Sequence, residues 1–159
     1  MNMSIPAFHV SDASKVTGAG DVVIASRAGG GAAGVFALRV SAHFDPLIDD
    51  YPTGSLTIKA DLTDSVRATF TATSVELINS YGKHNPTVCL TGRCTSDAAV
   101  GAAPVKGLRY WVMLVDNKGP DGPAGTPDVA GFAIHDRNGV RIAYGTGPLK
   151  GGDFKVMPK

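Results

Sequence analysis

Hydrophobic and polar residues alternate along several segments of the chain, so that every second side chain is apolar. In residues 35–43, for example, Phe36, Leu38 and Val40 share one face. A period of two is typical of a β-strand with one buried face, and the 3.6-residue period of an amphipathic helix is scarcely present. The other segments predicted to form strands are 5–10, 22–26, 55–62, 65–79, 87–95, 108–115, 129–136, 140–144 and 153–156.

The pattern changes inside the segment 65–79. Even-numbered positions are apolar up to residue 72, and then Val75 and Leu77 are apolar instead. A change of parity within one strand predicts a β-bulge, here near Thr73 and Ser74.

Two further segments have a specific pattern. Asn138-Gly139 is the pair that supplies two positive-φ residues to a type I′ turn, and it predicts a hairpin over residues 136–140. Residues 108–115 are apolar on both faces, which predicts a central strand covered on both sides.

The composition supports the same architecture. Glu76 is the only glutamate among 14 acidic residues, so the other 13 are Asp, and the chain holds 20 Gly. Asp and Gly favour turns, whereas Glu favours helices. We therefore expect residues 1–159 to form one all-β domain, an antiparallel β-barrel or β-sandwich of about eight to ten strands.

The charges narrow the possible partners and locations. The net charge is +1 and the Lys and Arg residues are scattered along the sequence, so we expect no nucleic-acid partner. No run approaches the roughly 18 apolar residues of a membrane span. No secretory leader is visible, which leaves a cytoplasmic protein and a secreted protein with its leader removed as alternatives.

Several motifs resemble a family of bacterial extracellular β-domains that occur beside choice-of-anchor regions, the post-COAP domains. They cover roughly the C-terminal 60% of the chain, from Ser65 onward. The resemblance implies a secreted or cell-surface domain without catalysis, and it brings no catalytic residues and no cofactor. The motifs are SVELI (74–78), CLTGRCT (89–95), YWVMLVDN (110–117), VAGFAI (129–134) and LKGGDF (149–154).

Cys89 and Cys94 are the only cysteines. If residues 90–93 form a tight hairpin loop, the two Cα atoms could approach the roughly 4.4–6.8 Å that a disulfide requires. The Thr91-Gly92 pair favours such a turn, and a disulfide would support secretion. If residues 89–94 instead form one straight strand, the cysteines lie about 16 Å apart on opposite faces and stay free.

A Gly/Pro-rich loop over residues 116–128 offers oxygen ligands for Ca²⁺ at Asp116, Asn117, Asp121 and Asp128. The spacing is not that of an EF-hand. The alternative is an ordinary loop whose Asp side chains bond to its own backbone.

Three residues are candidates for acid–base catalysis. His43 lies beside Asp45 in an acidic segment, where the alternative is a solvated loop. Glu76 lies next to the expected bulge, a kind of position where side chains are often redirected for function. Glu76 is also the acidic residue whose position is least explained by the predicted turns.

Two functions follow as hypotheses. The first is a non-catalytic binding or assembly domain, whose exposed strand edges could pair with a second copy. The second is a small β-barrel enzyme, of cyclase or isomerase type, acting on an apolar small molecule in an internal pocket. That pocket would be lined by Phe36, Arg39, Phe70, Tyr110, Trp111, Met113, Phe132 and Tyr144.

Overall fold

The computed structural model describes residues 13–24, 33–62, 67–82, 86–97, 105–117 and 125–158. Within these ranges all regular structure is β, and no helix there is long and apolar enough to cross a membrane. The segment 5–10, predicted as a strand, lies outside them. The strands are β1 (Ser14–Ile24), β2 (Gly34–Phe44), β3 (Thr53–Leu62), β4 (Arg67–Ala72), β5 (Leu77–Tyr81), β6 (Thr87–Ser96), β7 (Val105–Val115), β8 (Val129–His135) and β9 (Arg141–Pro158).

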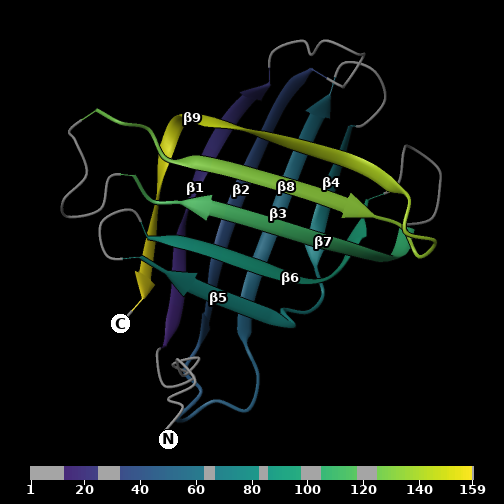
Figure 1. Ribbon diagram of the computed structural model, residues 1–159. Helices are drawn as coiled ribbons and strands as arrows, with labels where there is room; N and C mark the ends of the chain where they lie inside the picture. Colours follow the sequence, from purple (N-terminus) through teal and green to yellow (C-terminus); the bar gives the residue numbers. More distant parts are fainter. Residues whose placement is uncertain are drawn as a thin grey trace, which may run out of the picture.

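The strands close into an antiparallel barrel, which decides between the two predicted architectures. The order is β4-β3-β2-β1-β9-β8-β7-β6-β5, and an additional pairing of β4 with β6 joins the ends. Eight strands form the closed barrel, and β5 is an extra strand beside β6. In Figure 1, β1, β2 and β3 run behind β5 to β8 and cross them steeply.

The long strand β9 belongs to both sides of the barrel. Residues 141–148 pair with β8, and residues 149–158 pair with β1. The strand bends between these halves, as the yellow ribbon in Figure 1 shows, through a segment rich in glycine. At Gly152 φ is +101°, and a Cβ there would collide with the carbonyl oxygen of Ala19. The sequence predicted two short strands here because these glycines are typical of a loop.

The core fills the barrel interior. Inward-facing residues of successive strands are almost completely buried, and Phe36 of β2 contacts Phe132 of β8 edge to face, with ring centroids 4.6 Å apart. Burial of each such side chain contributes about 1.5–3 kcal/mol to folding. The alternation predicted for β2 and β3 is confirmed.

The irregularity predicted near Thr73 and Ser74 is present, but it is larger than one residue. Both of their N–H groups donate to the carbonyl of Arg93. Ala72 pairs with Cys94 and Leu77 pairs with Thr91, so four residues on one strand face two on the other. Two extra residues leave the parity of the pleat unchanged. The even-numbered face therefore resumes at buried Ile78, and Leu77 is 64% exposed.

The hairpin over residues 136–140 is confirmed, but its turn type differs from the prediction. The N–H of Gly139 donates to the carbonyl of Asp136, and among non-glycine residues described none has positive φ. Within the turn, positive φ is therefore confined to Gly139, at +79°. This is a type I turn followed by a glycine bulge. The Asp136 carboxylate stabilises it by accepting from the N–H groups of Asn138 and Val140.

Candidate functional site

The eight residues expected to line one pocket are divided between the inside and the outside of the barrel. Because neighbours in a strand face opposite sides, Tyr110 and Trp111 cannot both point inward. Phe36, Phe70, Tyr110 and Phe132 are 0–2% exposed and belong to the hydrophobic core. The members that face outward are Arg39, Trp111, Met113 and Tyr144.

The outward position of Trp111 also corrects the expectation for residues 108–115. The inner face of β7 is buried as predicted, but Trp111 on its outer face is 41% exposed. The strand is therefore central in its sheet and covered on one side only.

Tyr110 is the tyrosine among the largest fully buried side chains. Its hydroxyl donates to the carbonyl of Ser74 at 2.8 Å. Burial raises the pKa of this phenol, and the neighbouring Cys94 and Glu76 raise it further. Tyr110 is thus protonated at neutral pH and fastens β7 to the irregularity between β4 and β5. It stabilises the fold and is not poised for proton transfer.

The predicted disulfide between Cys89 and Cys94 is wrong. Both residues lie on the single strand β6, with Cys89 on the outer face and Cys94 on the inner face, and both are free. The Thr91-Gly92 pair continues the strand because it is paired on both sides, with β5 and β7 at Thr91 and with β7 at Gly92. Burial raises the pKa of the Cys94 thiol to about 11, so this thiol is unreactive at neutral pH.

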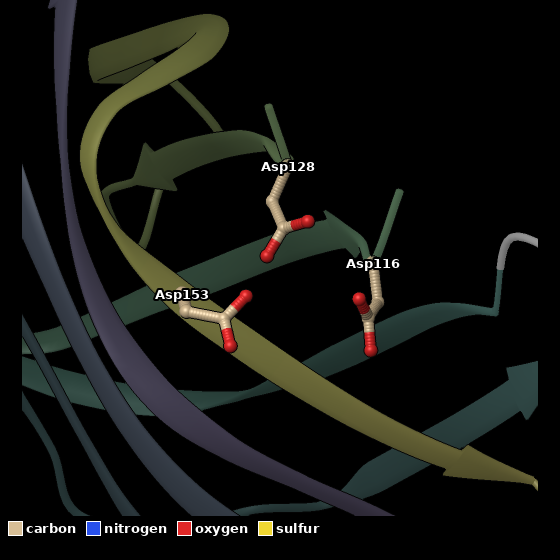
Figure 2. A group of neighbouring side chains, drawn as sticks. All are labelled: Asp116, Asp128 and Asp153. Carbon is tan, nitrogen blue, oxygen red and sulfur yellow. The ribbon is translucent and has the colours of Figure 1, made fainter. Parts of the chain in front are cut away.

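Two of the four predicted calcium ligands come together, and they are joined by a residue that the sequence did not indicate. Asp116 follows β7, Asp128 precedes β8 and Asp153 lies on β9, as Figure 2 shows. One carboxylate oxygen of each lies within 4.8 Å of the others. In the described part of the chain, these are the side chains that offer oxygen ligands to a divalent cation.

This acidic cluster has a structural role. The Asp128 carboxylate, fully buried, accepts from the N–H of Phe154 at 2.9 Å, and the Asp116 carboxylate accepts from the N–H of Val156 at 3.2 Å. Both N–H groups lie on the edge of β9 that β8 no longer covers. The two carboxylates therefore complete the hydrogen bonding of this strand edge.

The third predicted ligand, Asn117, is engaged within the loop. The side-chain amide of Asn117 donates to the carbonyl of Pro127, which is a bond within the loop. Asp121 lies outside the described residues.

His43 and Asp45 do not form a catalytic pair. The ring of exposed His43 shares a hydrogen bond of 3.3 Å with the hydroxyl of Thr53. The Asp45 carboxylate accepts from the N–H of Leu47, and the Asp49 carboxylate accepts from the N–H of Asp45. These bonds close the acidic loop on itself, which is the alternative that the sequence left open.

Glu76 is held by two arginines at the irregularity between β4 and β5. Its carboxylate bonds Arg109 at 2.6 Å and Arg93 at 3.3 Å. The hydrogen bond from Arg109 is the largest cause that lowers the pKa of this carboxyl below its ordinary value, and the nearby charges of both arginines add to it. Glu76 is therefore ionised at neutral pH and suited to pairing with cations, not to acid catalysis.

The two arginines belong to a row of basic residues that runs across the outside of four strands. Arg93 on β6 lies directly opposite Arg109 on β7, Arg109 lies opposite His135 on β8, and His135 lies opposite Arg141 on β9. Arg137, in the adjoining hairpin, reaches over Gly107 beside this row. We call Arg93, Arg109, His135 and Arg141 the basic row.

A second row runs parallel to the basic row, two residues away from it on β6, β7 and β8 and three residues away on β9, where the register shifts. It contains Thr91, Trp111, Ala133 and Tyr144, again in direct cross-strand register. The small residues Thr91 and Ala133 flank Trp111 on both sides. Tyr144 carries the guanidinium of Arg141 over its ring, 3.8 Å from the centroid. We call Trp111 and Tyr144 the aromatic row, and both rows together the β6–β9 face.

The opposite side of the barrel has a shallow hollow of about 580 Å³ on the outside of β1 to β4. Arg39 lines it, together with Asp21, Lys59 and Thr69. Its charges are of both signs, and a smaller hollow of about 320 Å³ continues it toward Arg67.

Comparisons with protein-family models, with curated proteins and with solved structures found no match to this chain. The function is therefore argued from the arrangement of the side chains.

Sequence reasoning missed the β6–β9 face as a unit. Arg109, Trp111 and Tyr144 could be recognised as residues of interest, but the basic row depends on which residues of four separate strands lie opposite one another. The available signal was the predicted hairpin, which places His135 at the end of β8 and Arg141 at the start of β9.

Proposed function

We propose that this protein is a non-catalytic binding module, and that its β6–β9 face binds an anionic ligand. The observation that carries the proposal is the basic row. Like charges placed directly opposite each other on neighbouring strands destabilise a sheet, and here Arg93 faces Arg109 with one acid, Glu76, between their side chains. An anionic ligand would remove this repulsion.

The geometry of the row fits recognition of an anion. Guanidinium groups present several N–H donors in a plane and bind carboxylate, sulfate or phosphate at two points. Arg93 and Arg109 keep 69% and 47% of their side chains exposed although both contact Glu76. They remain accessible to a ligand from solvent.

The interior supports binding on the outer surface rather than catalysis in a pocket. The inward aromatic residues belong to one buried hydrophobic core, and the buried Tyr110 and Cys94 are protonated at neutral pH. A closed barrel with such a core is a suitable scaffold for a surface site. Barrel closure pairs β4 with β6, whereas β5 pairs with β6 alone, so pairing with a second copy would depend on the other edge of β5.

A secreted or cell-surface location stays part of the proposal because of the resemblance to extracellular domains. The free cysteines add no support to it.

Retention on an immobilised sulfated polymer tests the proposal. The Arg109→Ala/Arg141→Ala double variant should elute at clearly lower salt than the wild type, because two cations of the basic row are lost. The matched control is Arg39→Ala/Arg67→Ala, which removes the same charge from the opposite face. Equal elution of the two double variants would show that the β6–β9 face has no special role.

A further inference from the structure

Resting on the proposed function, we infer that the anionic ligand of the β6–β9 face is a single-stranded nucleic acid. Its phosphates would lie along the basic row and a base would stack on Trp111. Proteins that bind single strands without sequence preference combine these two elements, a positive track for the backbone and aromatic side chains for the bases.

The two rows are separate and parallel. Residues 109 and 111 of β7 are two positions apart, which is about 6.6 Å along a strand, and both rows cross the strands in the same direction. A single strand has the same arrangement, because its charges lie on one side and its flat rings on the other. In an acidic polysaccharide the charges are attached to the rings themselves, so the two features would not separate.

The surroundings of Trp111 leave its ring open to stacking. Its cross-strand neighbours are Thr91 and Ala133, neither of which is large enough to cover an indole. Beyond Thr91, β5 places exposed Leu77 in the same row. An open sheet face of this kind can hold unstacked bases, whereas the paired bases of a duplex are already stacked on one another.

The basic row presents guanidinium donors. Among the described residues, the acid in ion pairs with the row is Glu76, whose carboxylate is engaged by Arg93 and Arg109. Recognition of sugar hydroxyls needs free acceptors as well as donors, whereas phosphates need donors alone.

The inference reverses the expectation drawn from the net charge. That expectation rested on the scatter of Lys and Arg along the sequence, and strand register gathers three arginines and one histidine into a single row. Electrostatic binding depends on this local arrangement and not on the total.

The experiment uses the whole chain and a fluorescein-labelled oligo-dT, with binding followed by anisotropy. Trp111 is the only tryptophan, so its intrinsic fluorescence reports on stacking directly. We expect the oligonucleotide to quench this fluorescence and to bind with a dissociation constant below about 10⁻⁴ M at low salt, the weak end of the non-specific range. With three phosphate contacts, the slope of log K against log salt should be about −2.

Two variants locate the binding. Trp111→Ala should weaken oligo-dT binding about tenfold or more by loss of one stacked base. Arg109→Ala should weaken it less and reduce the salt slope by about 0.7. Arg39→Ala on the opposite face should bind as the wild type does. Far-ultraviolet circular dichroism confirms that each variant is folded.

Two further ligands are dextran sulfate and a duplex of the same length as the oligo-dT. They distinguish failure of the nucleic-acid inference from failure of the proposed function. If dextran sulfate binds through Arg109 while oligo-dT does not, the nucleic-acid inference is overturned and the proposed function stands. If neither polymer binds, both are overturned. Equal affinity for duplex and single strand, or oligo-dT binding that is indifferent to Trp111→Ala, also overturns the inference.

Discussion

The basic residues on the two outer faces of the barrel have different cross-strand neighbours. On the β1–β4 side Arg39 lies opposite Ala19 and Thr57, Lys59 lies opposite Ala37 and Thr69, and Arg67 forms an ion pair with Asp61. These three cations have small, neutral or acidic neighbours, and the exception on this side is Lys15, which lies opposite His43. On the β6–β9 side three successive cross-strand pairs join residues that are basic.

Both faces use the same antiparallel ladder, so the difference does not come from the architecture. Apart from Lys15, which lies opposite His43, the described arginines and lysines of the β1–β4 side have no basic residue directly opposite them. The basic row therefore carries a cost that folding did not require. Such local conflicts with stability are expected at functional sites, and this is why we place the function on the β6–β9 face.

The largest expected effect is on stability, and it should come from weakening the attachment of β9, the strand that belongs to both sides of the barrel. Asp128→Ala leaves the buried N–H of Phe154 without the acceptor that holds β9 in place. The cost should be about 1–3 kcal/mol, which lowers Tm by several degrees for a chain of this size at about 2–4 °C per kcal/mol. Differential scanning calorimetry measures the shift.

Asp128→Asn is the control, because the amide retains an acceptor oxygen at the same place. It should lose less stability than Asp128→Ala. An unchanged Tm for Asp128→Ala would mean that the hydrogen bond contributes nothing to holding the shared strand.

The next largest effect should be on binding. Reversing two charges of the basic row, in Arg109→Glu/Arg141→Glu, should abolish retention on a sulfated polymer at any salt concentration that retains the wild type. The introduced glutamates then repel the sulfate groups that the arginines attracted. The two kinds of group are closer together than the Debye length, so salt screens this repulsion little. The same reversal on the other face, Arg39→Glu/Arg67→Glu, should leave most of the retention. If both variants lose it equally, net charge and not the row governs binding.

Removing the acid of the β6–β9 face should strengthen binding. Glu76→Gln frees the guanidinium groups of Arg93 and Arg109, so we expect dextran sulfate to bind several-fold more tightly at neutral pH. A weaker or unchanged affinity would show that Glu76 positions the arginines for the ligand instead of competing with it.

Measuring the affinity for dextran sulfate over a pH series tests, without a mutation, whether the Glu76 carboxylate competes with the ligand. The pKa of Glu76 in the folded protein lies below its ordinary value of 4.5. The stabilisation by its ion pairs is therefore fully present above about pH 4.5 and is lost as the pH falls through the lowered folded pKa. Sulfate groups stay charged there, so the wild type should approach the affinity of Glu76→Gln as the pH falls.

The smallest effect should come from the ion pair on the opposite face. Arg67 and Asp61 are 3.0 Å apart, but their side chains are 85% and 63% exposed. Arg67→Ala should cost less than about 1 kcal/mol by urea unfolding and should leave polymer binding unchanged. A larger loss would mean that this pair holds β4 at the closure of the barrel.

Local pattern was sufficient to predict most strands. Alternation at Phe36, Leu38 and Val40 gave one buried face of β2, and Asn138-Gly139 located the β8–β9 hairpin. The turn type differs because Asn138 does not take positive φ. The start of β1 was missed because Gly18, Ala19 and Gly20 lack the large side chains that make alternation visible.

Features that depend on distant pairing could not be predicted in this way. Whether Thr91-Gly92 turns or continues was decided by β5 and β7, which pair with β6 from either side. Asp153 joins Asp116 and Asp128 only because β9 bends across the ends of β7 and β8. The basic row, likewise, is a product of register among four strands.

The passage of β9 from β8 to β1 has a consequence for synthesis of the protein on the ribosome. Residues 149–158 are the partners of residues 14–22. The second edge of β1 is therefore covered only after β9 has been synthesised. Pairings of such large sequence separation form slowly. Until they form, β1 exposes an unpaired edge in the nascent chain, and a newly made molecule depends on its final strand for protection from aggregation.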